Sequence, residues 1–175
     1  GEGGNLGMTQ KARLEYWERG GLCNTDAIDN SGGVDMSDHE VNIKILLDIL
    51  VREKVIASKE ARNVVLEQMT DNVSELVLDD NRFQARAITL DSVRSVVDYD
   101  AFVELIEQMI TDRVFNRQDQ AVPSRDALLS SPHRRRGLPR PLLAVLLGQA
   151  KMHAYDLTLA SSFPDSPSGL PLLTR

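Results

Sequence analysis

The sequence from Asn24 to Glu40 reads Asn-Thr-Asp-Ala-Ile-Asp-Asn-Ser-Gly-Gly-Val-Asp-Met-Ser-Asp-His-Glu and joins a polar loop to the start of a helix. Within one loop length it combines side chains that cap turns, two glycines that admit a close neighbour, and a serine at a helix start. Few inert loops have this combination, which indicates a binding site. From spacing alone, an ordinary turn before a well-capped helix remains the simpler interpretation.

Ser37 and Glu40 have the spacing of a capping box, in which the serine hydroxyl accepts from the Glu40 N–H and the carboxylate reaches back to Ser37. This pattern predicts a helix that begins at Ser37 and runs to about Arg52. A hydroxyl also has a proton to donate, so Ser37 can bind an anion in front of the helix, where the helix dipole favours negative charge. Gly32 and Gly33 leave room for such a ligand.

The composition allows one domain with a core or pieces of two domains, since 42% of the 175 residues are hydrophobic and 26% are charged. A net charge of −6 and a pI near 5.1 argue against a general binder of nucleic acid or anionic membranes, which needs a basic surface. The run His133-Arg-Arg-Arg136 is a local exception. It lies between Pro132 and Gly137 without an adjacent aromatic residue, which favours a structural loop.

Cysteine usage and the lack of long apolar stretches predict a soluble, cytoplasmic protein. The single cysteine, Cys23, excludes an internal disulfide and is compatible with a reducing cytosol. No base lies beside it, so a small buried residue is favoured over a nucleophile. No stretch approaches the roughly 20 apolar residues of a membrane span, and no charged and apolar leader opens the chain. The start at Gly1, inside a glycine-rich turn, indicates a piece of a larger protein.

Most of the chain has the pattern of helices. The segment Leu22–Thr25 is so short that it could form only a minimal strand, which would give the first part of the chain an α/β-like organisation. A tail rich in turn formers follows Phe163. Helices are predicted over 9–19, 37–52, 58–69, from 70 or 71 to at least 88, from about 98 to at least 110, and over 142–160, with one short helix begun by Ser124.

Two segments carry a family resemblance: Gly1-Glu-Gly-Gly-Asn-Leu-Gly-Met-Thr-Gln10, and the stretch from Asn24 onward to Lys44. Together they resemble the large NAD-specific glutamate dehydrogenases. The likeness continues more weakly through Gln68–Asp71, Asp79–Asn81 and Arg140–Leu147. It implies a mostly α chain: residues 1–52 would end a Rossmann-like α/β dinucleotide-binding catalytic domain, and residues 53–175 would form a helical C-terminal region.

The resemblance also implies a site and a reaction. It places Asn5 beside the dinucleotide, Asn30 near the nicotinamide carboxamide, and Ser37 where a serine donates to the distal carboxylate of glutamate. Gly32, Gly33 and Val34 would line the pocket, the glycines on the cofactor side and Val34 on the substrate side. The implied reaction is the NAD-dependent oxidative deamination of L-glutamate to 2-oxoglutarate and ammonia, by an enzyme expected to be a homo-oligomer.

The chain also departs from the family pattern. The lysines and the aspartate that the family uses for substrate binding and proton transfer are not among these residues. The main glycine-rich fingerprint is absent too, because Leu6 occupies its last position and no strand precedes the turn. No catalytic residue is therefore assigned, and the chain alone is not expected to catalyse.

Two other functions compete with the dehydrogenase. Asp35, Asp38, His39 and Glu40 could bind a metal ion, but one histidine with carboxylates at a helix start more often caps the helix, so no metal is predicted. The segment after Arg52 could instead be a helical protein-interaction or regulatory module. That function does not account for the glycine-rich loops.

Overall fold

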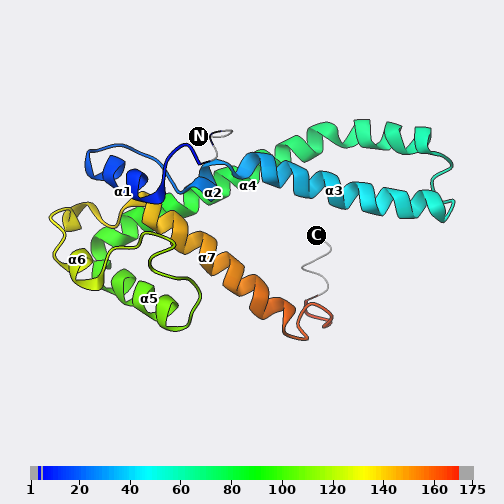
Figure 1. Cartoon of the computed structure of the whole chain (residues 1–175). Helices are drawn as coiled ribbons and strands as arrows, with labels where there is room; N and C mark the ends of the chain where they lie inside the picture. The colour runs from blue at the N-terminus through cyan, green and yellow to red at the C-terminus, as the bar shows by residue number, and fades with distance from the viewer. Residues whose placement is uncertain (1–3, 5, 170–175) are drawn as a thin grey trace. The chain divides into compact units, whose positions relative to one another are not determined.

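The computed structural model describes Gly4 and residues 6–169, and every regular element among them is a helix (Figure 1). The mostly α expectation is confirmed. The helices are α1 (Gln10–Glu18), α2 (Asp26–Asp29), α3 (Ser31–Arg52), α4 (Lys59–Val97), α5 (Tyr99–Thr111), α6 (Arg125–Leu129), the 3-10 helix η1 (Arg134–Arg136) and α7 (Arg140–Leu159).

The strand predicted over Leu22–Thr25 is wrong, because these residues have no regular structure and no strand is found among the described residues. Side chains hold this segment instead of a neighbouring strand. The Arg13 guanidinium donates to the Asn24 carbonyl at 3.0 Å, and Arg140 Nε donates to Asn24 Oδ1 at 2.7 Å. The α/β character expected for residues 1–52 is therefore not seen in this part of the chain.

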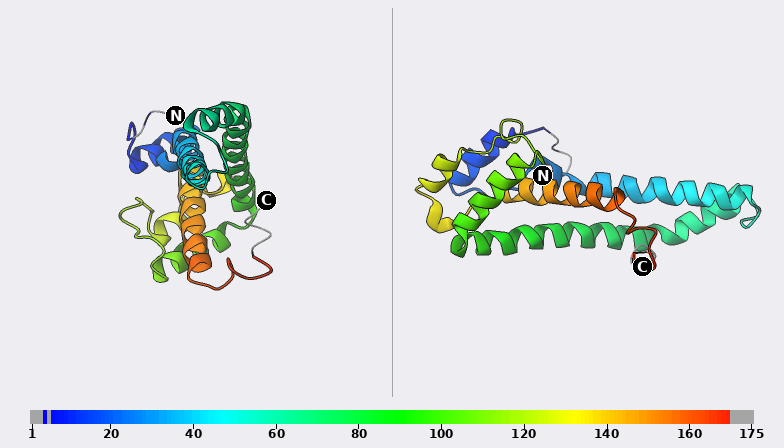
Figure 2. Two further views of the ribbon diagram at one scale, coloured as in Figure 1. Left: turned by 90° about the vertical axis from the view of Figure 1, so that its right-hand side faces the viewer. Right: turned by 90° about the horizontal axis from the view of Figure 1, so that it is seen from below.

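The chain divides into two compact units. One contains Gly1–Met8 and Asp26–Ala87, and we call it the hairpin unit; the other contains Thr9–Thr25 and Ile88–Arg175, and we call it the core unit. Helix α4 passes from the first unit to the second after Ala87. Within the hairpin unit, α3 and the first part of α4 run antiparallel, as the views in Figures 1 and 2 show.

Helix α4 is one continuous helix of 39 residues, so the predicted break near residue 70 is wrong. Its start agrees with the prediction, since Ser58 Oγ accepts from the Ala61 N–H at 3.2 Å. Thr70 does not cap a second helix. Its hydroxyl donates to the Leu66 carbonyl one turn earlier, at 3.3 Å, which is how a threonine inside a helix satisfies its hydroxyl.

The core unit is built around α5 and the first half of α7. The largest fully buried side chains of the described chain belong to it, among them Ile88, Val103, Ile106, Leu142 and Leu143. The predicted helix starts here are confirmed: Asp98 is the N-cap residue of α5, Ser124 caps α6, and a proline occupies the first turn of α7. Tyr99 OH donates to the Leu128 carbonyl at 2.9 Å, and burial raises the pKa of this hydroxyl, so it remains a donor.

Two arginines of the basic run, Arg134 and Arg136, have structural partners. The Arg136 guanidinium lies over the Trp17 ring at 4.3 Å and donates to the Trp17 carbonyl at 3.1 Å. Arg134 lies 5.0 Å from the Tyr99 ring centroid and pairs with Asp100 at 2.5 Å. The aromatic partners come from distant positions in the sequence, so inspection of the neighbouring residues could not find them.

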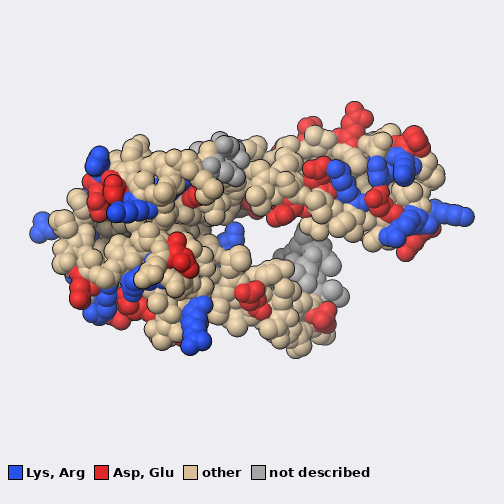
Figure 3. Space-filling model, in the orientation of Figure 1, with Lys and Arg blue, Asp and Glu red and all other residues tan. Residues whose placement is uncertain are grey.

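The surface charges are mixed. On the face seen in Figure 3, acidic and basic side chains alternate along the hairpin unit. No helix of the described residues is sufficiently long and apolar to cross a membrane.

Candidate functional site

Asn30 precedes the first residue of α3 and is 7% exposed. Its Nδ2 group donates to the Asp26 carbonyl at 3.1 Å and to Asp26 Oδ1 at 3.0 Å. Both partners are acceptors, so the orientation of the amide follows from the contacts themselves. Its Oδ1 atom is buried and accepts no hydrogen bond in the described structure. A buried oxygen left in this state costs about 1–3 kcal/mol, so Asn30 presents an acceptor for a donor from water, a ligand or another part of the protein.

The glycine-rich turn near the start of the chain is joined to Asn30 through Asp26. The Leu6 N–H donates to Asp26 Oδ1 at 3.2 Å, and the Gly7 N–H closes the turn on the Gly4 carbonyl at 2.8 Å. The structure thus links the two segments that carry the resemblance. Asn5, predicted to lie beside the dinucleotide, is outside the described residues.

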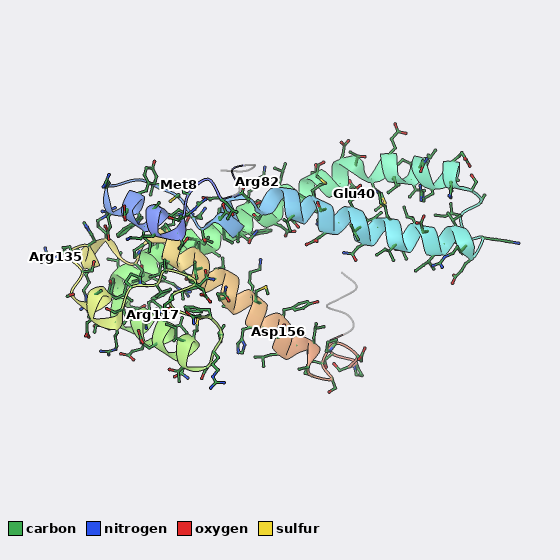
Figure 4. All side chains as sticks on the ribbon, viewed as in Figure 1. Met8, Glu40, Arg82, Arg117, Arg135 and Asp156 are labelled. Carbon is green, nitrogen blue, oxygen red and sulfur yellow. The ribbon has the colours of Figure 1, made fainter. Side chains whose placement is uncertain are left out.

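The capping box predicted at Ser37 is wrong, because α3 begins six residues earlier, at Ser31. Ser37 Oγ donates to the Gly33 carbonyl at 2.9 Å, and Glu40, which Figure 4 shows on α3, pairs with Lys44 instead of reaching back. Contacts to α4 explain the earlier start. Ser31 Oγ donates to Asn81 Oδ1 at 2.6 Å, and Gln84 Nε2 lies 3.4 Å from the same hydroxyl.

Four of the predicted site residues share one side of α3. Residues 30, 33, 34 and 37 are spaced at helical intervals of three and four, which places Asn30, Gly33, Val34 and Ser37 along one stripe. Gly33, Val34 and Ser37 are exposed, and Asn30 is buried at the start of the stripe. Gly32 lies in the same helical turn but on the other side by this spacing. We call Asn30, Gly33, Val34 and Ser37 the α3 stripe.

Ser37 is a weaker anion donor than the sequence indicated. Its one proton is directed to the Gly33 carbonyl, so the hydroxyl must rotate and give up that bond before it can donate to a ligand. It also no longer stands at a helix terminus, so the dipole of the first turn acts at Ser31 and not at Ser37.

The residues that could bind a metal ion differ from those expected from the sequence. His39 Nε2 lies 3.7 Å from Asp35 Oδ1 and 3.9 Å from Asp80 Oδ2, and these three side chains could share a cation. Asp38 and Glu40 are not part of this group. Sequence reasoning missed Asp80 because it belongs to α4, and only the pairing of the two helices brings it close. When His39 is protonated, the same contacts form an ion pair across the hairpin. The group lies on the side of α3 opposite the α3 stripe.

Comparison with known proteins identifies the family. Residues 1–91 match the sequence model of the family described as bacterial NAD-glutamate dehydrogenase, catalytic domain. This match covers the glycine-rich turn, α1, α2, α3 and most of α4. No solved structure shows a significant match to the chain.

Three curated relatives are named NAD-specific glutamate dehydrogenase. The chain is 41% identical to the protein of Halomonas elongata over 175 residues, which are 100% of this chain and 11% of that protein. It is 41% identical to the protein of Mycobacterium tuberculosis and 42% identical to that of Pseudomonas aeruginosa, each over 94% of this chain and 10% of the relative. The chain therefore spans about a tenth of the length of these relatives. Since the family model covers more than half of its residues, the chain belongs to the bacterial NAD-glutamate dehydrogenase family.

Proposed function

We propose that the chain is part of an NAD-dependent glutamate dehydrogenase, an oxidoreductase that converts L-glutamate to 2-oxoglutarate and ammonia. Membership of the family supports this activity. So do the three relatives, whose names specify both NAD and glutamate. The observation that carries the proposal is the family match over residues 1–91, and the buried Asn30 Oδ1, which accepts no hydrogen bond although Asp26 holds the amide nitrogen, supports a ligand contact there.

The residues present fit a nicotinamide cofactor. A carboxamide group offers an N–H donor, and Asn30 Oδ1 is a buried acceptor that lacks one. When bound, NAD supplies the hydride acceptor for the oxidation. The role of Asn30 is to hold the carboxamide and so to fix the position of the ring. Asn5, Gly32 and Gly33 are proposed to contact the same cofactor.

Val34 and Ser37 are proposed to contact the substrate. Val34 is 63% exposed on the α3 stripe, where its apolar surface can lie against the carbon chain of glutamate. Ser37 lies one turn further along the same stripe and would donate to the distal carboxylate after turning away from the Gly33 carbonyl. We assign no proton transfer to any residue of this chain. Catalysis therefore requires groups that the chain does not supply.

We propose that residues 1–52 belong to the end of a Rossmann-like NAD-binding catalytic domain and that residues 53–175 form a helical C-terminal region. The division follows the end of α3 at Arg52, while the family match continues to residue 91, within α4. We further propose a cytoplasmic homo-oligomer that binds neither nucleic acid nor membrane. The net charge of −6 and the mixed surface charges support the last point.

A helical interaction module is the alternative, and one observation favours it. The hairpin unit leaves large apolar side chains more than half exposed, including Val41, Ile45, Leu46, Val64 and Leu76. Such surfaces commonly contact another protein or another part of the same protein. The two functions are compatible if these helices join the catalytic region to its surroundings.

The proposed activity is tested with the intact protein that carries this sequence. We expect glutamate-dependent reduction of NAD, followed at the absorbance of NADH, with much weaker activity when NADP replaces NAD. The variant Asn30→Ala should raise the KM for NAD and leave the KM for glutamate nearly unchanged. An intact, folded protein that does not reduce NAD in the presence of glutamate would refute the proposal in favour of the interaction module.

A further inference from the structure

Asp26 makes four hydrogen bonds at the candidate site. Its Oδ1 atom accepts from Asn30 Nδ2 at 3.0 Å and from the Leu6 N–H at 3.2 Å. Its carbonyl accepts from Asn30 Nδ2 at 3.1 Å and from the Asn30 N–H at 3.0 Å. One residue thus holds the side chain of Asn30, the backbone of Asn30 and the glycine-rich turn.

These contacts determine which atom Asn30 presents. An amide nitrogen has two protons, and both are directed to oxygens of Asp26. A flipped amide would bring Asn30 Oδ1 against a carboxylate and a carbonyl, which repel it, so Asp26 keeps the oxygen pointing away. The carboxylate also makes the hydrogen bond charge-assisted, which strengthens it relative to a neutral pair.

Asp26 acts on the glycine-rich turn in the same way. Leu6 has a φ of 58°, in the left-handed region that residues other than glycine seldom adopt. Its side chain is 88% exposed, so packing of the side chain does not hold this conformation. The hydrogen bond from the Leu6 N–H to Asp26 ties the turn to α2, one residue after Asn5 in the sequence.

We propose that Asp26 is a positioning residue for the nicotinamide ring: it orients the Asn30 amide so that Oδ1 accepts from the carboxamide, and it holds the glycine-rich turn beside it. The inference rests on the proposed function, since it assigns a partner to Asn30 Oδ1. It goes beyond that function because it makes the orientation of Asn30 depend on Asp26, whose carboxylate and main-chain carbonyl both accept from the amide nitrogen. Asp26 itself does not contact the reacting atoms.

The test uses two dinucleotides in the intact protein. In the 3-acetylpyridine analogue of NAD, a methyl group replaces the amide NH2, so the analogue cannot donate to Asn30. The measured quantity is the ratio of kcat/KM for NAD to kcat/KM for the analogue. Differences in intrinsic reactivity between the two dinucleotides cancel when this ratio is compared between variants. A residue that only stabilises the fold would lower both values of kcat/KM and leave the ratio unchanged.

Asp26→Ala is expected to lower the ratio several-fold, by less than the loss of a whole hydrogen bond, because the main-chain carbonyl of residue 26 still accepts from Asn30 Nδ2. Asn30→Ala should lower the ratio about tenfold, since it removes the acceptor itself, and the double variant should lower it no further than Asn30→Ala alone. Asp26→Asn keeps an oxygen that can accept from Asn30 and should retain most of the ratio. Asp38→Ala, which removes an exposed carboxylate of the same unit, should leave the ratio unchanged.

An unchanged ratio in folded Asp26→Ala would overturn the proposal. If Asp26→Ala does not fold, Asp26→Leu fills the volume without accepting hydrogen bonds and carries the same expectation. If neither variant folds, Asn30→Ala decides the question: a folded Asn30→Ala protein with an unaltered ratio leaves no carboxamide contact for Asp26 to position, and likewise overturns the proposal. Failure of the proposed function looks different: the wild-type protein itself would then not reduce NAD with glutamate.

Discussion

The hairpin unit and the core unit differ in how their residues are held. The largest fully buried side chains of the described chain all lie in the core unit, whereas the hairpin unit buries few apolar residues, chiefly Leu47 and Val77. Its precise contacts are polar: Asn30 with Asp26, and Ser31 with Asn81. The proposed cofactor and substrate contacts all belong to the hairpin unit. Its site geometry therefore depends on individual hydrogen bonds, which a single substitution can remove.

The largest expected effect is on the core unit. Leu142 is fully buried, so Leu142→Ala removes apolar contacts and leaves a cavity, at a cost of about 2–5 kcal/mol. The measurement is hydrogen exchange of the α5 and α7 amides in the intact protein. Leu46 is 57% exposed on α3 of the hairpin unit, so Leu46→Ala should change the protection of the α3 amides by less than about 0.5 kcal/mol. Equal losses in the two variants would contradict the comparison between the units.

The next largest effect is on the KM for NAD, which should distinguish Asn30 from Asn24. Asn30→Ala should raise the KM for NAD about tenfold, since one hydrogen bond of about 1.4 kcal/mol is lost. Asn24 belongs to the core unit, where two arginines hold it: Arg13 donates to its carbonyl and Arg140 donates to its Oδ1. Asn24→Ala should lower the thermal stability of the protein without changing the KM for NAD. A tenfold effect of Asn24→Ala on that KM would show that cofactor binding is not confined to the hairpin unit.

Ser37→Ala should raise the KM for glutamate roughly two- to tenfold. A hydrogen bond to a carboxylate is stabilising, but the serine must first give up its bond to the Gly33 carbonyl, so the net change is about 0.5–1.5 kcal/mol. Ser74→Ala is the matched control, because Ser74 makes the same kind of bond, to the Thr70 carbonyl at 2.9 Å. An unaltered KM for glutamate in Ser37→Ala would exclude Ser37 from the substrate site.

The smallest expected effect tests the revised start of α3. Glu40 and Lys44 form an exposed pair one turn apart, which stabilises a helix by about 0.3–0.5 kcal/mol. Glu40→Ala and Lys44→Ala should therefore reduce amide protection in α3 by the same small amount. A loss near 1 kcal/mol in Glu40→Ala alone would restore the capping box at Ser37.

Local patterns predicted most of the helices correctly because their ends are local. Thr9, Ser58 and Ser124 each accept from a backbone N–H three residues later, within the window that a sequence motif describes. The start of α3 was mispredicted for the opposite reason. Two glycines after Asn30 indicated a loop, but Asn81 and Gln84 hold Ser31 from 50 and 53 residues away. The resemblance located the candidate site. It did not indicate that Asp26 accepts hydrogen bonds from both Asn30 and Leu6, because no sequence motif describes these contacts.

The sequence by itself determined the helical character of this chain, most of its helix ends and its family, because each depends on residues close together along the chain. Only the tertiary structure decided where α3 begins, that α4 is continuous, and that Asp26 joins Asn30 to the glycine-rich turn. Those features depend on hydrogen bonds between segments far apart in the sequence. The stretch from Asn24 to Glu40 is thus helical for most of its length, and the buried Asn30 amide between its two helices is held by Asp26 from the preceding helix.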